Sequence, residues 1–363
     1  MKKISVCTVC MNRLYHLSKT LPVNIAENQG YPNLEFVILN YNSRDGMDDW
    51  MRSHMDQHIA SGLVKYYRTD EPEYFDMAHS KNMVSRLATG EIICNIDADI
   101  FAGPGYVTWV QECFAALGPD IVITTLRKDA IPYRDTGGKI CFTREIFTKV
   151  NGYDESLIGY GMDDVDLCNR IEKAGVNRVF IEEEKYLRYI PHSDRVRLAN
   201  YRYPHNLKGI YHCTTEAVPG RLKVLYLFND GSAEELVYRY NEAIQSDLVA
   251  TFVGWTLEEG GQRKGNFHRS QDRMVLNFVD SPALTYAING GQLRSTGPGA
   301  PSAWQELIQG ESNYHMAEVG YTECLNRRKF WHNDKSAVHI NEKGWGRGNV
   351  VRNFNTEDVV SIR

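Results

Sequence analysis

Two carboxylates separated by one residue follow an apolar run in this chain. The run reads EIICNI, and the acids are Asp97 and Asp99. Alternate residues of an extended chain project to one side, so both acids can face the same ion. Negative charge beside a core is costly unless a cation compensates it, and hard oxygen ligands suit Mg²⁺ or Mn²⁺. The pattern therefore predicts a divalent cation that holds a diphosphate, although Asp-x-Asp is also a common tripeptide without any such role.

Three further acids follow a glycine-punctuated turn. The stretch Gly159 to Asp166 reads GYGMDDVD and contains Asp163 and Asp164. If a helix begins here, acids in its first turn are favoured by the helix dipole, which explains one of them as a cap. Three carboxylates within four residues also repel one another, and this raises the pKa of one of them, as a general base requires. Both interpretations follow from the residues.

Histidine and lysine add candidates at two other places. His192 lies in YIPHSDRVR, where it is either a hydrogen-bonded residue or, beside a carboxylate site, a ligand suited to Mn²⁺. Lys81 and His79 fall on a predicted helix that precedes the Asp97 strand. They either assist phosphates or are solvated helix residues.

Strands alternate with helices over the first half of the chain. We expect strands over residues 1–9, 34–39, 63–67, 91–100, 120–125, 139–142 and 177–182, and helices over 14–28, 48–59, 77–88, 104–117 and from Asp163 onward. This alternation predicts a mostly parallel sheet with crossover helices on its faces. Ligands in such sheets bind outside the carboxyl ends of the strands, so residues 10–13, 40–45 and 97–99 are where a nucleotide is expected.

Composition narrows the class of protein. The chain has 363 residues, 42% of them hydrophobic, enough for a catalytic domain plus an appendage. A net charge of -5 argues against a nucleic-acid partner. We find no secretion signal and no run of about 20 apolar residues that could span a membrane, so the expected location is cytoplasmic.

The cysteines and the C-terminal part carry less information. The eight cysteines are scattered and are expected to be reduced. Cys7 and Cys10 form a C-x-x-C, which is either a redox or zinc half-site or a pair of core residues; without a second such pair, we favour the core. Beyond about residue 215 the pattern predicts no particular fold. We therefore expect a catalytic domain over 1–215 and an accessory or acceptor-side region over 216–363.

Four stretches together resemble family 2 and galactosyltransferase-type inverting GT-A glycosyltransferases. They are NRLYHL at 12–17, NIDADI at 95–100, NGYDESLIGYGMDDVDLCNRI at 151–171 and IPHSD at 190–194. The likeness covers roughly the first 200 residues. It implies the GT-A fold, a Rossmann-like, mostly parallel α/β sheet, followed by a region of uncertain fold.

The resemblance also implies roles at individual positions. Asp99 and His192 would be metal ligands, and Asp164 the catalytic base. Asp97 would lie near the ribose or a metal-bound water. The sugar contacts would come from Tyr160, Gly161 and Asp163, and the remaining nucleotide contacts from Val9, Met11, Arg13, Asn40 and Lys81.

At four positions the chain departs from the pattern of these enzymes. Tyr160 replaces a tryptophan and Asp163 a glutamate, while Tyr189 stands where the galactosyltransferases have a methionine metal ligand. Asn40 occupies the place of an aspartate that reads uracil in many family 2 enzymes. The resemblance therefore does not identify the donor sugar.

The expected function is an inverting transfer, dependent on Mn²⁺ or Mg²⁺, of a hexose or N-acetylhexosamine. The donor would be a nucleotide diphosphate sugar, with UDP as the expected nucleotide, and the acceptor a hydroxyl of a glycan or glycoconjugate. Two alternatives remain. One is a sugar-nucleotide pyrophosphorylase, although the N-terminal region lacks a glycine-rich phosphate loop with a basic residue. The other is a carbohydrate-binding protein without catalytic activity.

Overall fold

The chain folds into two compact units. The computed structural model describes residues 1–126, 136–214, 220–240, 254–279, 281–297, 303–335 and 340–363. The first unit comprises residues 1–158, 162–193 and 332–363, and the second 159–161 and 194–331. The boundary expected at residue 215 lies outside the described residues, and the roles given to 1–215 and 216–363 stay predictions. The two compact units do not coincide with the predicted ranges 1–215 and 216–363, because the C-terminal strands belong to the first unit.

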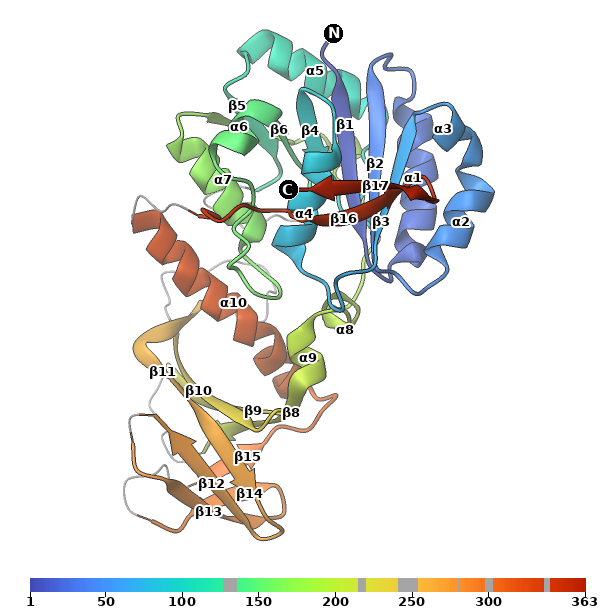
Figure 1. Ribbon diagram of the computed structural model, residues 1–363. Coiled ribbons are helices and arrows are strands. Elements are labelled where there is room, and N and C mark those ends of the chain that lie inside the picture. The colour runs from blue at the N-terminus through green and yellow to red at the C-terminus, as the bar shows by residue number, and fades with distance from the viewer. Residues whose placement is uncertain (127–135, 215–219, 241–253, 280, 298–302, 336–339) are drawn as a thin grey trace. The chain divides into compact units, whose positions relative to one another are not determined.

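A nine-stranded sheet forms the centre of the first unit (Figure 1). Its order is β17-β16-β3-β2-β1-β4-β6-β5-β7. The strands are β1 (Ile4–Cys10), β2 (Leu34–Tyr41), β3 (Val64–Thr69), β4 (Ile92–Asn95), β5 (Ile121–Thr124), β6 (Ile140–Thr143), β7 (Asn177–Phe180), β16 (Gly348–Arg352) and β17 (Asn355–Ile362). Strands β1 to β4 are mutually parallel, and β6 pairs antiparallel with both β4 and β5. The predicted mostly parallel sheet is confirmed.

Helices cover both faces of this sheet. They are α1 (Leu14–Asn28), α2 (Met47–His54), α3 (Asp56–Ala60), α4 (Met77–Leu87), α5 (Tyr106–Leu117), α6 (Arg144–Lys149) and α7 (Asp163–Lys173), with a 3-10 turn, η1 (Glu184–Tyr186). Residues of α1, α2 and α5 pack in one apolar core, and residues of α4, α6 and α7 pack in another. Burial on both faces explains why β2 (LEFVILNY) is almost continuously apolar.

The expected elements of the first half are confirmed with two corrections. The strand expected over 91–100 ends at Asn95, and Asp97 and Asp99 follow it in a turn in which the Ile100 N–H donates to the Asp97 carbonyl at 3.0 Å. A single helix was predicted over 48–59, but the chain leaves the helical conformation at Met55, whose φ and ψ are -116° and 5°. The segment therefore forms α2 and α3 in place of one helix. Cys10 belongs to the first core and Cys7 to the second, so these two cysteines occupy opposite faces of β1 as core residues. All eight cysteines are free thiols.

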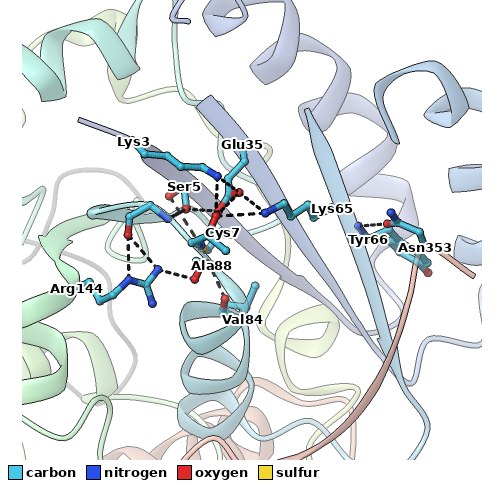
Figure 2. A network of polar contacts seen from close by, with 12 residues as sticks. Lys3, Ser5, Cys7, Glu35, Lys65, Tyr66, Val84, Ala88, Arg144 and Asn353 are labelled. Carbon is cyan, nitrogen blue, oxygen red and sulfur yellow. Dashed lines mark hydrogen bonds and ion pairs between the residues drawn. The ribbon is translucent and has the colours of Figure 1, made fainter. Parts of the chain in front are cut away.

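The C-terminal segment completes the first unit. Strand β16 pairs antiparallel with β3, and Asn353 just beyond it accepts a hydrogen bond from the Tyr66 backbone through Oδ1 at 3.0 Å (Figure 2). The residues before β16 pack on α4, where a Cβ added to Gly346 would lie 2.8 Å from the Asn82 backbone. This packing contributes to the burial of the polar residue Asn82 on α4.

A buried charge near the amino ends of the strands ties the sheet together. Glu35 on β2 is 1% exposed and accepts a hydrogen bond from Ser5 Oγ at 2.6 Å (Figure 2). The ammonium groups of Lys3 and Lys65 lie 3.0 and 2.6 Å from its Oε2 atom. Burial alone raises the pKa of Glu35, but the bonds from Lys65 and Ser5 outweigh it and lower the pKa to about 2.

The second unit contains a closed antiparallel barrel, a fold that the sequence pattern did not predict. Its order is β10-β11-β12-β13-β14-β15-β8-β9. The elements are α8 (Asp194–Leu198), α9 (Arg202–Asn206), β8 (Leu207–Cys213), β9 (Arg221–Phe228), β10 (Ser232–Tyr240), β11 (Trp255–Arg269), β12 (Arg273–Phe278), β13 (Leu284–Asn289), β14 (Gln292–Ser295), β15 (Ala303–Glu306) and α10 (Ser312–Lys335), which ends in the first unit. Tyr226 and Leu236 pack with residues of α10, whereas Leu225 and Leu227 pack with the other strands. Alternate residues thus face α10 and a separate barrel core.

No helix in the described part of the chain combines the length and the apolar composition needed to cross a membrane.

Candidate active site

Two loops at the carboxyl edge of the sheet brace each other. Asn12, after β1, has a φ of 53°, a left-handed conformation that asparagine tolerates. Its backbone N–H donates to Ser43 Oγ at 3.0 Å, and its Oδ1 accepts from the Arg44 backbone at 2.7 Å. Asp45 accepts from the Leu14 backbone at 2.7 Å. These contacts fix the predicted nucleotide residue Arg13 at the amino end of α1.

Asp99 and His192, the two predicted metal ligands, lie together. The distance from His192 Nε2 to Asp99 Oδ2 is 3.1 Å, and the side chains are 9% and 15% exposed. Burial raises the pKa of Asp99, but the hydrogen bond and charge of His192 outweigh it, and the pKa is lowered. The carboxylate is thus kept in the ionised form that metal binding needs.

Main-chain pairing brings these two residues together from distant parts of the sequence. Tyr189 and Ile100 form an antiparallel bridge, and the Ile190 N–H donates to the Asp99 carbonyl at 2.8 Å. Pro191 then leads directly to His192. The segment that carries the histidine is therefore aligned along the residues that follow β4.

The pair fits a divalent cation that completes its coordination with other oxygens. Among the described residues, no group of three or more His, Cys, Asp or Glu side chains is arranged to hold a metal ion. Mg²⁺ usually keeps several waters and binds through one or two carboxylates plus substrate phosphates, and imidazole is an accepted ligand for transition metals. One carboxylate and one imidazole suit a cation shared with a diphosphate.

Lys81 gathers the predicted base and its neighbours. This side chain on α4 is 3% exposed, so the alternative of a solvated helix residue is wrong. Its Nζ lies 2.8 Å from Asp164 Oδ1, 3.2 Å from Asp163 Oδ2 and 3.7 Å from Asp97 Oδ1. We call these four residues the Lys81 cluster. It joins the start of α7 to the residues that follow β4.

The Lys81 cluster holds more negative than positive charge. Burial lowers the pKa of Lys81, but Asp164, Asp97 and Asp163 together raise it well above its ordinary value. Burial and the charge of Asp163 raise the pKa of Asp164 to about 8, against the opposing charge of Lys81. One ammonium cannot compensate three carboxylates. A carboxyl group with a pKa near neutrality is suited to accept a proton from a substrate.

Neighbouring residues restrict where the side chains of Lys81 and Asp97 can lie. The Lys81 Nζ lies 5.4 Å from the ring centroid of the buried Tyr153, whose hydroxyl accepts a hydrogen bond from Asn95 Nδ2 at 3.0 Å. At Gly138, an added Cβ would lie 1.9 Å from Asp97 Oδ2. A side chain at position 138 would therefore displace Asp97. Gly138 lies outside the four stretches that carry the resemblance, and Tyr153 lies within the stretch 151–171 but was given no role there.

The third acid of the α7 turn has a different environment. Asp166 is 1% exposed and pairs with Arg170 Nε at 2.7 Å, one turn along the same helix. Asn333 Nδ2 donates to its other oxygen at 3.4 Å. The residue that caps α7 is Met162, which makes no side-chain capping bond. The three acids thus divide into two that bind Lys81 and one that anchors the helix.

Sequence reasoning missed His16 beside the metal pair. Its ring centroid lies 5.5 Å from that of His192 in an edge-on arrangement. The side chain is 5% exposed, and its Nδ1 has no hydrogen-bond partner among the residues that the structure describes. Burial and the charge of Arg13 lower the pKa of His16, which favours the neutral ring. Its position one helical turn after Arg13 in NRLYHL is the signal in the sequence that identifies it.

The other predicted nucleotide residues are buried or pack against the core. Met11 is 4% exposed in the second core, and Val9 packs against that core. Asn40 is 1% exposed, and its amide donates to Asp48 Oδ1 at 3.0 Å and to Tyr66 Oη at 2.8 Å. Its Oδ1 accepts from the Ser43 backbone at 2.7 Å. Asn40 therefore shapes the loop after β2, and base recognition by this residue stays a prediction.

Two predicted sugar contacts, Tyr160 and Gly161, belong to the second unit. Tyr160 is half-buried, and the guanidinium of Arg197 lies 4.9 Å from its ring centroid. The third predicted sugar contact, Asp163, begins α7 in the first unit.

Two family models match the part of the chain that carries these residues. Glycosyl transferase family 2 matches residues 5–165, and a model described as the N-terminal domain of galactosyltransferase matches residues 124–213. The two matched stretches overlap, and both models describe glycosyltransferases. The resemblance inferred from the four motifs and the expected GT-A fold are thereby confirmed, and the pyrophosphorylase alternative is set aside. No curated protein matches the chain.

Solved structures of glycosyltransferases are also similar to this chain. The mannosyltransferase PcManGT from Pyrobaculum calidifontis, in complex with GDP-Man and Mn²⁺, is 21% identical, with a TM-score of 0.43 over 52% of this chain and 57% of that one. S. aureus TarS 1-349 in complex with UDP-GlcNAc is 12% identical, with a TM-score of 0.40 over 52% of this chain and 62% of that one. The chain thus spans 57% and 62% of the lengths of these two structures.

Proposed function

We propose that the glycosyltransferase domain transfers a sugar from a nucleotide diphosphate donor, UDP-linked, to a hydroxyl group of a glycan or glycoconjugate, with inversion at the anomeric carbon. The observation that carries this proposal is the Lys81 cluster. In this cluster the carboxyl group of Asp164 has a pKa raised to about 8. Lys81 connects it to Asp97, one of the residues that follow β4. A base of this kind can deprotonate an alcohol that attacks the sugar directly.

The residues of the chain have separate tasks in this mechanism. Asp164 accepts the proton of the acceptor hydroxyl, and Lys81 keeps its carboxylate at a fixed place, 2.8 Å from the ammonium nitrogen. Asp163 and Tyr160 contact the two sugars, while Arg13 and Asp97 lie near the nucleotide. Asp99 and His192 would hold Mn²⁺ or Mg²⁺, which, when bound, offsets negative charge on the departing diphosphate. Holding both substrates in line contributes to the rate in addition to proton transfer.

Hydrolysis of nucleotide sugars tests the proposal without knowledge of the acceptor. The purified chain is incubated with UDP-glucose, UDP-galactose and UDP-N-acetylglucosamine, with and without Mn²⁺, and released UDP is measured. We expect slow release from at least one donor that depends on Mn²⁺ or Mg²⁺. Release from none of them, or release unaffected by removal of the metal, would contradict the proposal. Absence of release together with retained UDP-sugar binding would favour the alternative of a binding protein without catalytic activity.

A further inference from the structure

A helix of the second unit holds the loop that carries Tyr160. Thr322 Oγ1 on α10 accepts a hydrogen bond from the Tyr160 backbone N–H at 3.3 Å and donates one to the Tyr160 carbonyl at 3.1 Å. One turn later, Asn326 Nδ2 lies 2.9 Å from the Gly161 carbonyl and 3.3 Å from that of Tyr160. Thr322 and Asn326 are 0% and 2% exposed. Two buried polar side chains of α10 thus bind the backbone of this short loop.

The loop has a conformation that needs such support. Gly159 and Gly161 have φ values of 63° and 104°, and the non-glycine Met162 has 72°. Left-handed backbone in a residue other than glycine costs free energy and persists where surrounding contacts determine it. A Cβ at Gly159 would lie 2.8 Å from Thr322 Cγ2, so α10 also limits which residues the loop can contain.

The side chain of Tyr160 is held from the same unit. Arg197 on α8 places its guanidinium over the Tyr160 ring and donates to Asp194 Oδ1 at 2.6 Å. His315 on α10 lies 3.5 Å from Asp194 Oδ2. Backbone and ring of Tyr160 are therefore both tied, directly or through α8, to α10.

We propose that Thr322 and Asn326 are positioning residues of the sugar-binding site. They set the place of Tyr160 and, through the two residues that follow it, the direction in which the chain enters Asp163 and Asp164. A change at Thr322 or Asn326 should then alter sugar binding through Tyr160. This inference rests on the proposed function, since it takes Tyr160 as a sugar contact.

Amide hydrogen exchange tests the positioning without any substrate. Thr322→Val keeps the shape of the side chain but removes its hydroxyl. We expect the peptide over residues 157–162 to exchange at least about five-fold faster, because the Tyr160 N–H loses its hydrogen bond. Tyr321→Phe is the matched control, because it removes a hydrogen bond of the same helix, that to Glu234 Oε2 at 2.6 Å. Thr322→Ser should restore protection. Unchanged exchange in Thr322→Val, or an equal increase in Tyr321→Phe, would overturn the inference.

Kinetics separate positioning of the site from general stability. With Mn²⁺ and the UDP-sugar that the wild type hydrolyses best, Thr322→Val and Asn326→Leu should lower kcat about ten-fold, because a small displacement of a sugar contact lowers the rate strongly. UDP affinity and thermal midpoint should stay near those of Tyr321→Phe. Wild-type kcat in both variants would contradict the inference. If the wild type itself hydrolyses no UDP-sugar, the proposed function fails, whereas the exchange experiment still reports on the loop.

Discussion

Two buried clusters of charge lie at opposite ends of the parallel strands and differ in their balance. At the amino ends, the single carboxylate of Glu35 is bound by two ammonium groups. At the carboxyl ends, the single ammonium of Lys81 faces three carboxylates. The pKa of Glu35 is lowered to about 2, against the effect of burial. The pKa of Asp164 is raised to about 8, and burial is the largest cause of that shift. The first arrangement stabilises the fold, and the second holds a carboxyl group able to exchange a proton.

The strongest test of this difference is Asp164→Asn. Loss of a general base lowers turnover by about 10²- to 10⁴-fold, so UDP-sugar hydrolysis should nearly disappear while UDP binding, followed by calorimetry, persists. Because the folded state raises this pKa from 3.8 to about 8, ionisation of Asp164 costs stability as pH rises across that range. The variant should therefore unfold no more easily than the wild type at pH 8. An active variant would show that the base is assigned to the wrong residue.

Glu35→Gln is the same kind of substitution with the opposite expectation. It removes a charge bound by Lys65 and Lys3 and should lower the free energy of unfolding by about 2 kcal/mol at neutral pH, measured by urea denaturation. The fraction that stays folded should keep wild-type kcat. Since the pKa of Glu35 falls from 4.5 to about 2 on folding, its contribution is present above 4.5 and is lost as pH falls through 2. A stability that declines in acid equally in both proteins would contradict this account of the amino-end cluster.

Removal of the His192 imidazole should have a smaller effect on activity, and that effect should depend on the concentration of Mn²⁺. We expect His192→Ala to weaken activation by Mn²⁺ at least about ten-fold, with recovery at higher Mn²⁺. His54→Ala is the control, because His54 is exposed and stacks on Trp50. Titration of activity with Mn²⁺ after chelation gives the measurement. Equal activation curves for the wild type and His192→Ala would remove His192 from the metal site.

The first 180 residues could be interpreted from sequence because their signals are local. Apolar runs such as LEFVILNY alternate with amphipathic helices, and the acids of NIDADI follow directly after a run that is buried as β4. The pairing of Asp99 with His192 was accessible only through a resemblance, since 93 residues separate them and main-chain pairing of Ile100 with Tyr189 aligns them.

The remaining features depend on contacts between distant segments. Strand β11 reads WTLEEGGQRKGNFHR, without the apolar alternation that indicates a half-buried strand, so neither it nor the barrel was predictable. Lys81 stands on a helix whose polar residues suggest solvent exposure, but it is buried against Asp163, Asp164 and Tyr153, which lie more than 70 positions further along the chain. His16 lies in NRLYHL one turn after Arg13, but its closeness to the metal pair becomes visible only in its ring contact with His192.

The pH dependence of kcat/KM for UDP-sugar hydrolysis tests the central claim most directly, because it reports the ionisation of essential groups in the free enzyme. If Asp164 is the base, activity rises as pH increases through about 8, where that carboxyl group loses its proton. In Asp163→Asn the rise should move to lower pH, since the charge of Asp163 helps to raise the pKa of Asp164. A profile that is flat between about pH 6 and 9, or one that stays in place in Asp163→Asn, would contradict the account.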